Sequence, residues 1–199
     1  ISKFVWKFFG IGSRAFRVWT KRPAGAGIKM KAILHCDKNW GIGRNNDLMF
    51  RLPLDMKFFR ETTSGKVVVM GSNTLLSLPG GMPLKNRINI VLWPGGDRAR
   101  AAANGYAIAE TPDELKAEVR KYPADDVFVI GGAMMYRTML PYCSEVLVTK
   151  VDADGGADTH FPDLDKMSEW ELASRGEPIE DNGYTVRFCR YVNRNTLDI

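Results

Sequence analysis

An acid and two phenylalanines stand at helical spacing shortly after a Leu-Pro pair in the first half of the chain. If a helix begins near Pro53, then Asp55, Phe58, Phe59 and Thr62 share one of its faces, because positions i, i+3, i+4 and i+7 lie together. A carboxylate beside two phenyl rings can pair with the amidine-like edge of a flat nitrogen heterocycle, while the rings cover its apolar body. The alternative is an acid that complements the helix dipole above two core phenylalanines.

Two glycine-containing segments follow strand-like apolar runs and could approach a phosphate. Gly71-Ser72-Asn73-Thr74 comes after one run, and Gly131-Gly132 comes after another. At the carboxyl ends of strands in an open α/β sheet, glycine lets backbone N–H groups approach a phosphate at a helix N-terminus. The pyrophosphate of a dinucleotide could therefore bridge the two segments. Neither segment matches G-x-G-x-x-G, however, and a tight structural turn is the alternative for each of them.

Arg87 is the third candidate for chemistry. It ends the loop Pro83-Leu84-Lys85-Asn86-Arg87, directly before another apolar run. An arginine in this place can clamp a ligand carboxylate with two parallel hydrogen bonds. The alternative is an arginine that is merely exposed to solvent on a loop. Taken together, the residues indicate a crevice for an anionic cofactor.

The elements that must position these residues alternate along the chain. Short apolar runs separated by helical patterns predict an α/β domain on a mainly parallel sheet, with strands at 32–36, 66–70, 88–92, 126–130 and 145–149. Thr111-Pro112-Asp113-Glu114 predicts a helix start with its N-cap, first-turn proline and capping-box glutamate. Near the C-terminus, Asn182-Gly183 between the runs 170–172 and 184–189 predicts an antiparallel hairpin.

Composition and charge argue against several classes of protein. Three separated cysteines and two histidines signal neither a disulfide framework nor a metal site, and they fit a reducing compartment, so we expect a cytoplasmic protein without bound metal. The net charge of +5 is unevenly placed. Residues 1–29 hold seven bases and no acid, so the 21 bases and 23 acids that remain give residues 30–199 a charge of −2. We therefore expect no nucleic-acid partner.

The chain divides into an extension, residues 1–29, and a domain, residues 30–199. Up to Lys21, the apolar residues of the extension recur at helical spacing, and the basic residues fall on the other side of the predicted helix. The segment Pro23-Ala24-Gly25-Ala26-Gly27 is typical of a flexible linker. This basic amphipathic pattern contains no unbroken apolar run of ~20 residues, the length of a transmembrane helix. Four explanations fit this pattern. The extension could be a membrane-surface anchor, an organellar transit peptide, an engineered fusion or sequence upstream of a start at Met30.

An ordered series of motifs from Met30 to about Val192 resembles dihydrofolate reductase. The series is Trp40-Gly41-Ile42-Gly43, Asn46-Asp47-Leu48, Leu52-Pro53-x-Asp55-x-x-x-Phe59, Val69-Met70-Gly71-x-x-Thr74, Pro83-Leu84-x-x-Arg87, Val129-Ile130-Gly131-Gly132 and Asp158-Thr159-His160-Phe161-Pro162. The resemblance implies a dihydrofolate reductase-like, mainly parallel central sheet flanked by helices, with a C-terminal antiparallel hairpin. It also implies that NADPH gives a hydride to C6 of dihydrofolate, with protonation at N5.

The resemblance assigns the substrate site residue by residue. Asp55 and Thr149 are the implied catalytic residues: Asp55 binds the 2-amino and N3 edge of the pterin, Thr149 aids it through its hydroxyl or a water, and solvent water protonates N5. Because a dry pocket favours a neutral carboxyl, activity should depend on pH. Phe59 and Leu84 would pack on the benzoyl ring, and Arg87 would hold the glutamate α-carboxylate. The full implied substrate set is His35, Phe58, Phe59, Leu78, Leu84, Arg87 and Ile130.

The resemblance likewise assigns a cofactor site, with a mobile loop at 43–49 that closes over the nicotinamide and excludes water. The implied NADPH-binding residues are Ile42, Gly43, Leu48, Gly71, Ser72, Asn73, Thr74, Gly131, Gly132, Ala133, Met134, Met135 and Tyr136. Some positions depart from the family pattern. Met49-Phe50 replaces the usual Pro-Trp, while Ser72 and Trp93 stand where groups for the adenosine 2′-phosphate are usual. Either Arg98 supplies the missing positive charge for the 2′-phosphate, or the preference for NADPH over NADH is weakened.

Two competing hypotheses remain at this point. One is a reductase of the riboflavin pathway, which shares the fold and acts on a ribosylated pyrimidine. The other is a catalytically idle module that binds cofactor or is tethered to a membrane. The primary expectation is a monomeric dihydrofolate reductase.

Overall fold

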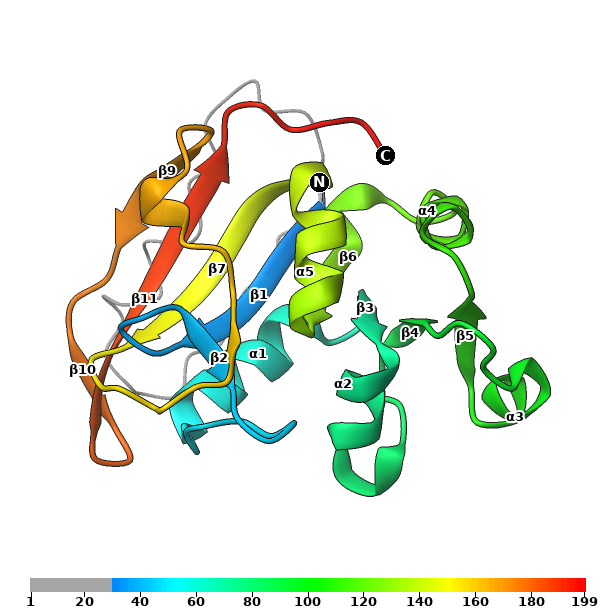
Figure 1. The fold of residues 1–199 in the computed structure, drawn as a ribbon, viewed down its shortest axis with the longest axis horizontal. Coiled ribbons are helices and arrows are strands. Elements are labelled where there is room, and N and C mark those ends of the chain that lie inside the picture. The colour runs from blue at the N-terminus through cyan, green and yellow to red at the C-terminus, as the bar shows by residue number, and fades with distance from the viewer. Residues whose placement is uncertain (1–29) are drawn as a thin grey trace, which may run out of the picture.

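The protein is described here by a computed structural model, in which residues 30–199 are described (Figure 1). The predicted amphipathic extension, residues 1–29, lies outside the described residues. No helix in the described part of the chain is long and apolar enough to cross a membrane.

A nine-stranded sheet organises the domain in the order β10-β11-β7-β1-β6-β3-β4-β5, with β9 paired to β11. The neighbours from β7 to β5 run parallel, whereas β11 is antiparallel to β7, β9 and β10. The strands are β1 (Met30–Cys36), β3 (Val67–Gly71), β4 (Ile88–Leu92), β5 (Tyr106–Ala109), β6 (Val127–Gly131), β7 (Cys143–Val151), β9 (Trp170–Arg175), β10 (Ile179–Asp181) and β11 (Tyr184–Asn193). A separate pair joins β2 (Gly41–Gly43) to β8 (Thr159–His160).

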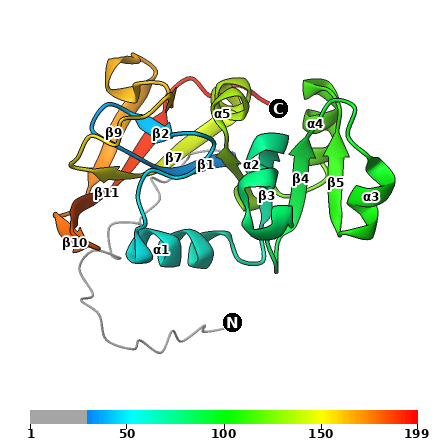
Figure 2. The same ribbon diagram turned by 60° about the horizontal axis from the view of Figure 1, so that its bottom comes forward.

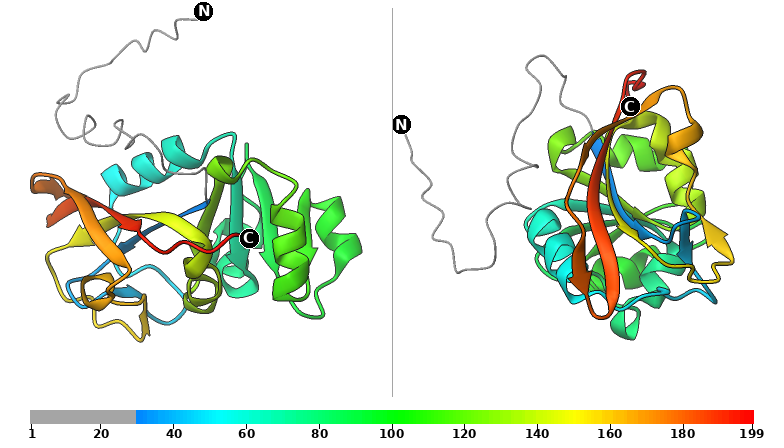
Figure 3. Two further views of the ribbon diagram at one scale, coloured as in Figure 1. Left: turned by 90° about the horizontal axis from the view of Figure 1, so that it is seen from above. Right: turned by 90° about the vertical axis from the view of Figure 1, so that its left-hand side faces the viewer.

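Helices cover both faces of this sheet, as parallel strands require, because their apolar runs are buried on both sides. The helices are α1 (Pro53–Thr63), α2 (Ser72–Ser77), α3 (Arg98–Ala103), α4 (Pro112–Val119) and α5 (Ala133–Met139), with short 3-10 turns at Pro79–Gly81, Ala124–Asp126, Leu140–Tyr142 and Leu164–Lys166. Figure 2 shows α1 on one face of the sheet and α5 on the other. In Figure 3, β9, β10 and β11 stand at one end of the molecule, and α3 and α4 stand at the opposite end.

Side-chain packing explains which face each helix covers. Phe58 of α1 packs with Ile33, Phe128 and Leu147. Successive side chains of a strand point to opposite faces of the sheet, so these three strand residues mark the face that α1 covers. On that opposite face, α5 contributes Met135, Tyr136 and Met139 to the main core. The face that α1 covers therefore carries the residues of β1 and β7 that lie nearest to Asp55.

The sequence predictions for α1, for the parallel sheet and for the Thr111 cap are confirmed. The Thr111 hydroxyl accepts a hydrogen bond from the Glu114 backbone N–H at 3.2 Å. The predicted C-terminal antiparallel hairpin is also confirmed, with Asn182-Gly183 as the turn between β10 and β11 and Asp181 opposite Tyr184. The run 170–172 lies in β9, which pairs antiparallel with the later part of β11. Strand β10 escaped detection because it has only three residues, two of them acids.

Candidate active site

Asp55 lies in the first turn of α1 and is buried, with 7% of its surface exposed. The residue before the helix, Leu52, has no side chain that can cap it. Asp181 of β10 supplies the cap instead, because its Oδ2 accepts the backbone N–H groups of Leu54 at 2.9 Å and Asp55 at 3.2 Å. A carboxylate here satisfies donors that have no partner within the helix and complements the positive end of its dipole. Asp181 thus fixes the position of Asp55.

We expect Asp181→Ala to lower the free energy of unfolding by about 1 kcal/mol, the usual cost of losing a helix cap. It should also raise KM for the substrate, since the first turn of α1 loses its anchor. Urea unfolding and steady-state kinetics measure the two effects. The matched control is Asp163→Ala, which removes the side-chain cap of the turn Leu164–Lys166 away from Asp55. An unchanged KM in the Asp181 variant would contradict the positioning role.

A histidine and a threonine from two neighbouring strands complete the polar part of the site. His35 Nδ1 lies 3.0 Å from Asp55 Oδ2, and both side chains are buried. Thr149 of β7 is the register partner of His35 on β1. Two buried atoms in this group, His35 Nε2 and Thr149 Oγ1, have no hydrogen-bond partner among the described residues. Because an unsatisfied buried polar group is costly, these atoms fit a ligand that brings its own polar edge.

Aromatic and aliphatic side chains surround this polar group. Phe58 packs edge-on against Phe188 of β11, with ring centroids 5.1 Å apart. Phe50 packs edge-on against Tyr184 at 4.9 Å and lies 6.3 Å from the His35 ring. Phe50 is the residue that departs from the expected tryptophan, and it still provides a buried ring beside the site. Aromatic rings therefore border the polar group formed by Asp55 and His35.

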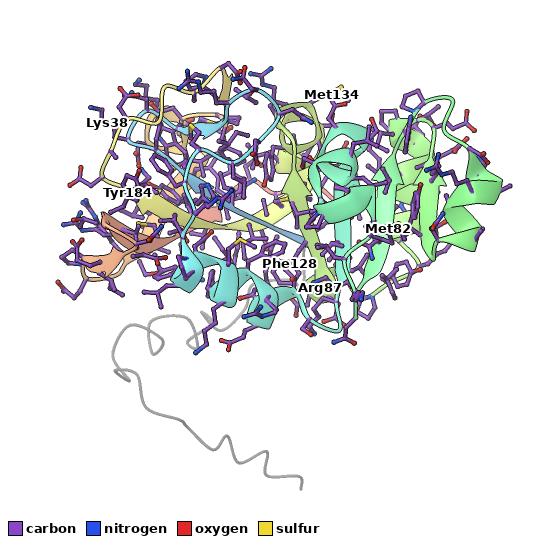
Figure 4. The ribbon with its side chains drawn as sticks, turned by 90° about the horizontal axis from the view of Figure 1, so that it is seen from below. Lys38, Met82, Arg87, Phe128, Met134 and Tyr184 are labelled. Atoms are coloured by element: carbon purple, nitrogen blue, oxygen red, sulfur yellow. The ribbon has the colours of Figure 1, made fainter. Side chains whose placement is uncertain are left out.

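Arg87 lies at the end of α1 that leads into β3, as Figure 4 shows. Its guanidinium donates to Thr63 Oγ1 at 2.9 Å and to the carbonyls of Lys85 at 2.7 Å and Arg60 at 3.4 Å, and it stands over the Phe59 ring at 5.8 Å. Partial burial lowers the pKa of Arg87, and the charge of Arg60 adds to this effect. A guanidinium has five N–H donors, so two remain free to bind a carboxylate. Within residues 30–199, Arg87 forms no ion pair that would compete.

Three more predicted substrate residues lie between α1 and α2. Leu78, Leu84 and Ile130 belong to one apolar cluster with Leu75 of α2. Ile130 also packs with Phe59 against the cluster around Phe58. Ile130 thus joins the two clusters into one apolar wall. The predicted substrate residues are thus brought together along one side of the sheet.

The two glycine segments meet because β3 and β6 are neighbours in the sheet. Met70 of β3 is the register partner of Gly131, which is joined to Gly132 by a cis peptide bond. A Cβ on Gly132 would lie 3.4 Å from Thr74 Oγ1, and one on Gly131, whose φ is 120°, would lie 3.3 Å from the Tyr136 ring. Open space borders Gly71, where an added Cβ would meet nothing within 4 Å. Bare backbone at these strand ends fits the phosphates of a dinucleotide.

Residues of α5 and α2 in the predicted cofactor set differ in what their side chains can contact. Met135 and Tyr136 are buried, and the Tyr136 hydroxyl donates to the Ile33 carbonyl at 2.9 Å. Met134 is 62% exposed, and Figure 4 places it at the surface. Ala133 and Ser72 are half-buried, whereas Asn73 is exposed. Of these residues, Met134 and Asn73 therefore face solvent, whereas Met135 and Tyr136 belong to the core.

The predicted closing loop, residues 43–49, begins at β2 and is fastened to the segment before β8. Asp158 Oδ2 accepts the backbone N–H of Asn45 at 2.7 Å, and this hydrogen bond lowers the pKa of Asp158. Ile42 packs against the main core, and Gly43 pairs with Thr159. Leu48 lies on this loop and is 54% exposed.

Sequence reasoning missed the two residues that fix Asp55. The sequence predicts a substrate contact for His35, but it reveals neither the pairing of His35 with Asp55 nor the role of Asp181. No local signal could reveal Asp181, since it stands 126 residues from Asp55. A buried acid and a histidine in an apolar strand were the only hints of the pair.

Comparison with known proteins agrees with this geometry. The model of the dihydrofolate reductase family matches residues 29–193. The dihydrofolate reductase of Bacillus subtilis is 35% identical over 82% of this chain and 94% of its own length. That of Neisseria gonorrhoeae is 32% identical over 84% and 99%, and that of Schistosoma mansoni is 30% identical over 82% and 96%. With its sheet order, its buried helical acid and its paired glycine junctions, the chain belongs to the dihydrofolate reductase family.

Proposed function

We propose that the chain reduces 7,8-dihydrofolate to 5,6,7,8-tetrahydrofolate with NADPH, by hydride transfer to C6 and protonation at N5. The observation that carries this proposal is the buried Asp55 carboxylate beside unpartnered polar atoms on β1 and β7. A pterin presents adjacent N–H donors on its 2-amino and N3 edge, and an ionised carboxylate accepts two of them at once. Family membership supports the same substrate.

Asp55 orients the ring, and Thr149 assists it. Asp55 binds the 2-amino and N3 edge, while the Thr149 hydroxyl accepts the remaining amino proton directly or through a water. Phe58 and Ile130 lie beside the ring and keep bulk water away from its faces. Solvent water delivers the proton to N5, and Asp55 supports that step by its charge.

The remainder of the substrate extends along the apolar wall toward Arg87. Phe59 and Leu84 pack on the benzoyl ring, and Leu78 adjoins Leu84. The two free N–H groups of Arg87 bind the glutamate α-carboxylate, because a planar fork matches the two oxygens of a carboxylate.

NADPH supplies the hydride when it is bound. Residues Gly71–Thr74 and Gly131–Met135 would hold its phosphates and ribose, and Ile42, Leu48 and Tyr136 would lie near the nicotinamide. Closure of the loop 43–49 excludes water from the ring. Open space beside Gly71 and the bare backbone at Gly131-Gly132 support this placement.

An assay with purified protein tests the proposal. Dihydrofolate and NADPH should be consumed in equal amounts, with loss of the nicotinamide absorbance and formation of tetrahydrofolate. A ribosylated aminopyrimidine, the substrate type of the related riboflavin-pathway reductases, serves as the comparison. Turnover of that compound without turnover of dihydrofolate would overturn the proposal.

We propose that Arg98 does not take the place of the cation that is usual at position 72. Its guanidinium donates to Glu110 at 2.9 Å and to Glu114 at 2.6 Å, so two acids neutralise it. We expect Arg98→Ala to change the Kd of NADPH less than about fivefold, because an exposed ion pair contributes little free energy. Quenching of tryptophan fluorescence measures this Kd, with Arg100→Ala as the control on the same helix. A much larger loss confined to the Arg98 variant would show that Arg98 leaves the acids to bind the 2′-phosphate.

We further propose a monomeric cytoplasmic enzyme without a nucleic-acid partner. The three cysteines, all buried thiols, are compatible with a reducing compartment. The charge of −2 on residues 30–199 offers no general attraction for phosphate backbones.

We also propose that residues 1–29 associate with anionic membrane surfaces through their seven bases and aromatic side chains. Removing residues 1–27 should abolish binding to anionic vesicles and leave turnover intact.

A further inference from the structure

We propose that His35 is a positioning residue, which donates its Nδ1–H to Asp55 and holds that carboxylate ionised and aimed at the substrate ring. The inference rests on the proposed function and adds a group to its machinery. Its starting point is the distance of 3.0 Å between His35 Nδ1 and Asp55 Oδ2, from side chains that are 5% and 9% exposed. At that distance one of the two atoms carries a hydrogen between them.

The chemistry of the ligand decides which atom carries the hydrogen. A pterin edge offers N–H donors, so Asp55 must accept with both oxygens and cannot keep a proton of its own. The hydrogen between the residues therefore belongs to His35 Nδ1. A carboxylate has about four lone-pair sites, so it can accept from His35 and from two ring N–H groups together. His35 is then the neutral Nδ1–H tautomer, and its Nε2 is an acceptor.

The surroundings of the pair favour this neutral tautomer. Nε2 is buried and has no acceptor for a proton among the described residues, so an imidazolium would bury an unsatisfied charged donor. Phe50 and the α1 face supply mainly apolar neighbours. Thr149, the register partner on β7, is uncharged.

Two other ionisable side chains act on the pair. Asp181 of β10 accepts the backbone N–H of Asp55 and so binds the helix rather than the imidazole. Burial raises the pKa of Tyr136 on α5, and the charge of Asp55 raises it further, so this phenol stays neutral. Its hydroxyl donates to Ile33, two residues before His35. No described cation forms an ion pair with Asp55, and His35 is therefore the side chain that steadies its charge.

This arrangement has a measurable consequence for the pH dependence of turnover. An N–H donor stabilises an ionised carboxylate more than the neutral acid. Removing the donor from His35 should therefore shift the ionisation that controls turnover to higher pH. The shift should be about one pH unit or more, given the strength of a hydrogen bond to a charged group.

The experiment compares His35→Leu with His35→Asn across the full pH profile of kcat. Leucine fills the space without a donor, whereas the asparagine amide can place an N–H near the position of Nδ1. We expect the midpoint to move upward in the leucine variant and to return to within a few tenths of a pH unit of the parent in the asparagine variant. Cys36→Ala is the control, because Cys36 is the next residue on β1 and is buried in the main core on the opposite face. It should leave the midpoint unchanged.

A second measurement does not depend on dihydrofolate turnover. The chain has two histidines, and His160 is exposed, so ¹⁵N spectra of labelled, ligand-free protein can be assigned with His160→Asn. His35 should show a protonated Nδ1 and an unprotonated Nε2. The opposite tautomer, or equal pH midpoints in the leucine variant and the parent, would overturn the proposal. Absence of turnover in the parent, with the expected tautomer present, would overturn the proposed function instead.

Discussion

Asp55→Asn is expected to lower kcat for dihydrofolate by about two to four orders of magnitude, the range for loss of a group that supports proton transfer. Asparagine keeps the size of the side chain but turns one acceptor into an N–H donor, which then faces the ring N–H groups. Substrate orientation and the negative charge beside the ring are lost together. Binding of NADPH should stay within about twofold, because the glycine junctions lie on other elements.

Stopped-flow absorbance and fluorescence titration separate these two effects. The control is Asp113→Asn, an acid whose side chain is 95% exposed in the first turn of α4, and it should leave both quantities unchanged. An equal loss of catalysis and cofactor binding in the Asp55 variant would favour a module that binds cofactor without turnover. That result would contradict the role given to Asp55.

Arg87→Leu is expected to raise KM for dihydrofolate by about 10- to 100-fold, as loss of a charge-assisted hydrogen bond to a carboxylate implies. The change should leave KM unaltered for a dihydropterin that lacks the glutamate. The selectivity follows from geometry, because Arg87 lies at the far end of α1 from Asp55. Steady-state kinetics with both substrates measures it.

Two further variants test the explanation. Arg87→Lys keeps the charge without the planar fork and should fall between the parent and the leucine variant. Arg60→Leu removes a neighbouring exposed cation and should change KM less than about threefold. A similar rise of KM for both substrates in Arg87→Leu would indicate a general disturbance of α1, and the carboxylate clamp would then be wrong.

The sequence predicted the elements whose signals are local. Helix α1 was recognised from the spacing of Asp55, Phe58 and Phe59 after Pro53, because one face of a helix must be apolar to pack on a sheet. The parallel strands were recognised from continuous apolar runs, which burial on both faces requires. The two glycine junctions meet because β3 and β6 are parallel neighbours, and that strand order is seen only in the assembled sheet. Short polar strands such as β10 carry no comparable pattern.

The motif order predicted the family and the reaction, and it supplied candidate residues for the site. Only the tertiary structure decided how their charges are balanced. It placed His35 against Asp55, Asp181 beneath the first turn of α1, and Arg98 between two glutamates. The physical reason is that sequence spacing records which face of an element a residue occupies, whereas strand order and register decide which charged group stands opposite. Because an electrostatic interaction depends on the distance and burial of both partners, it is settled only when the sheet is assembled.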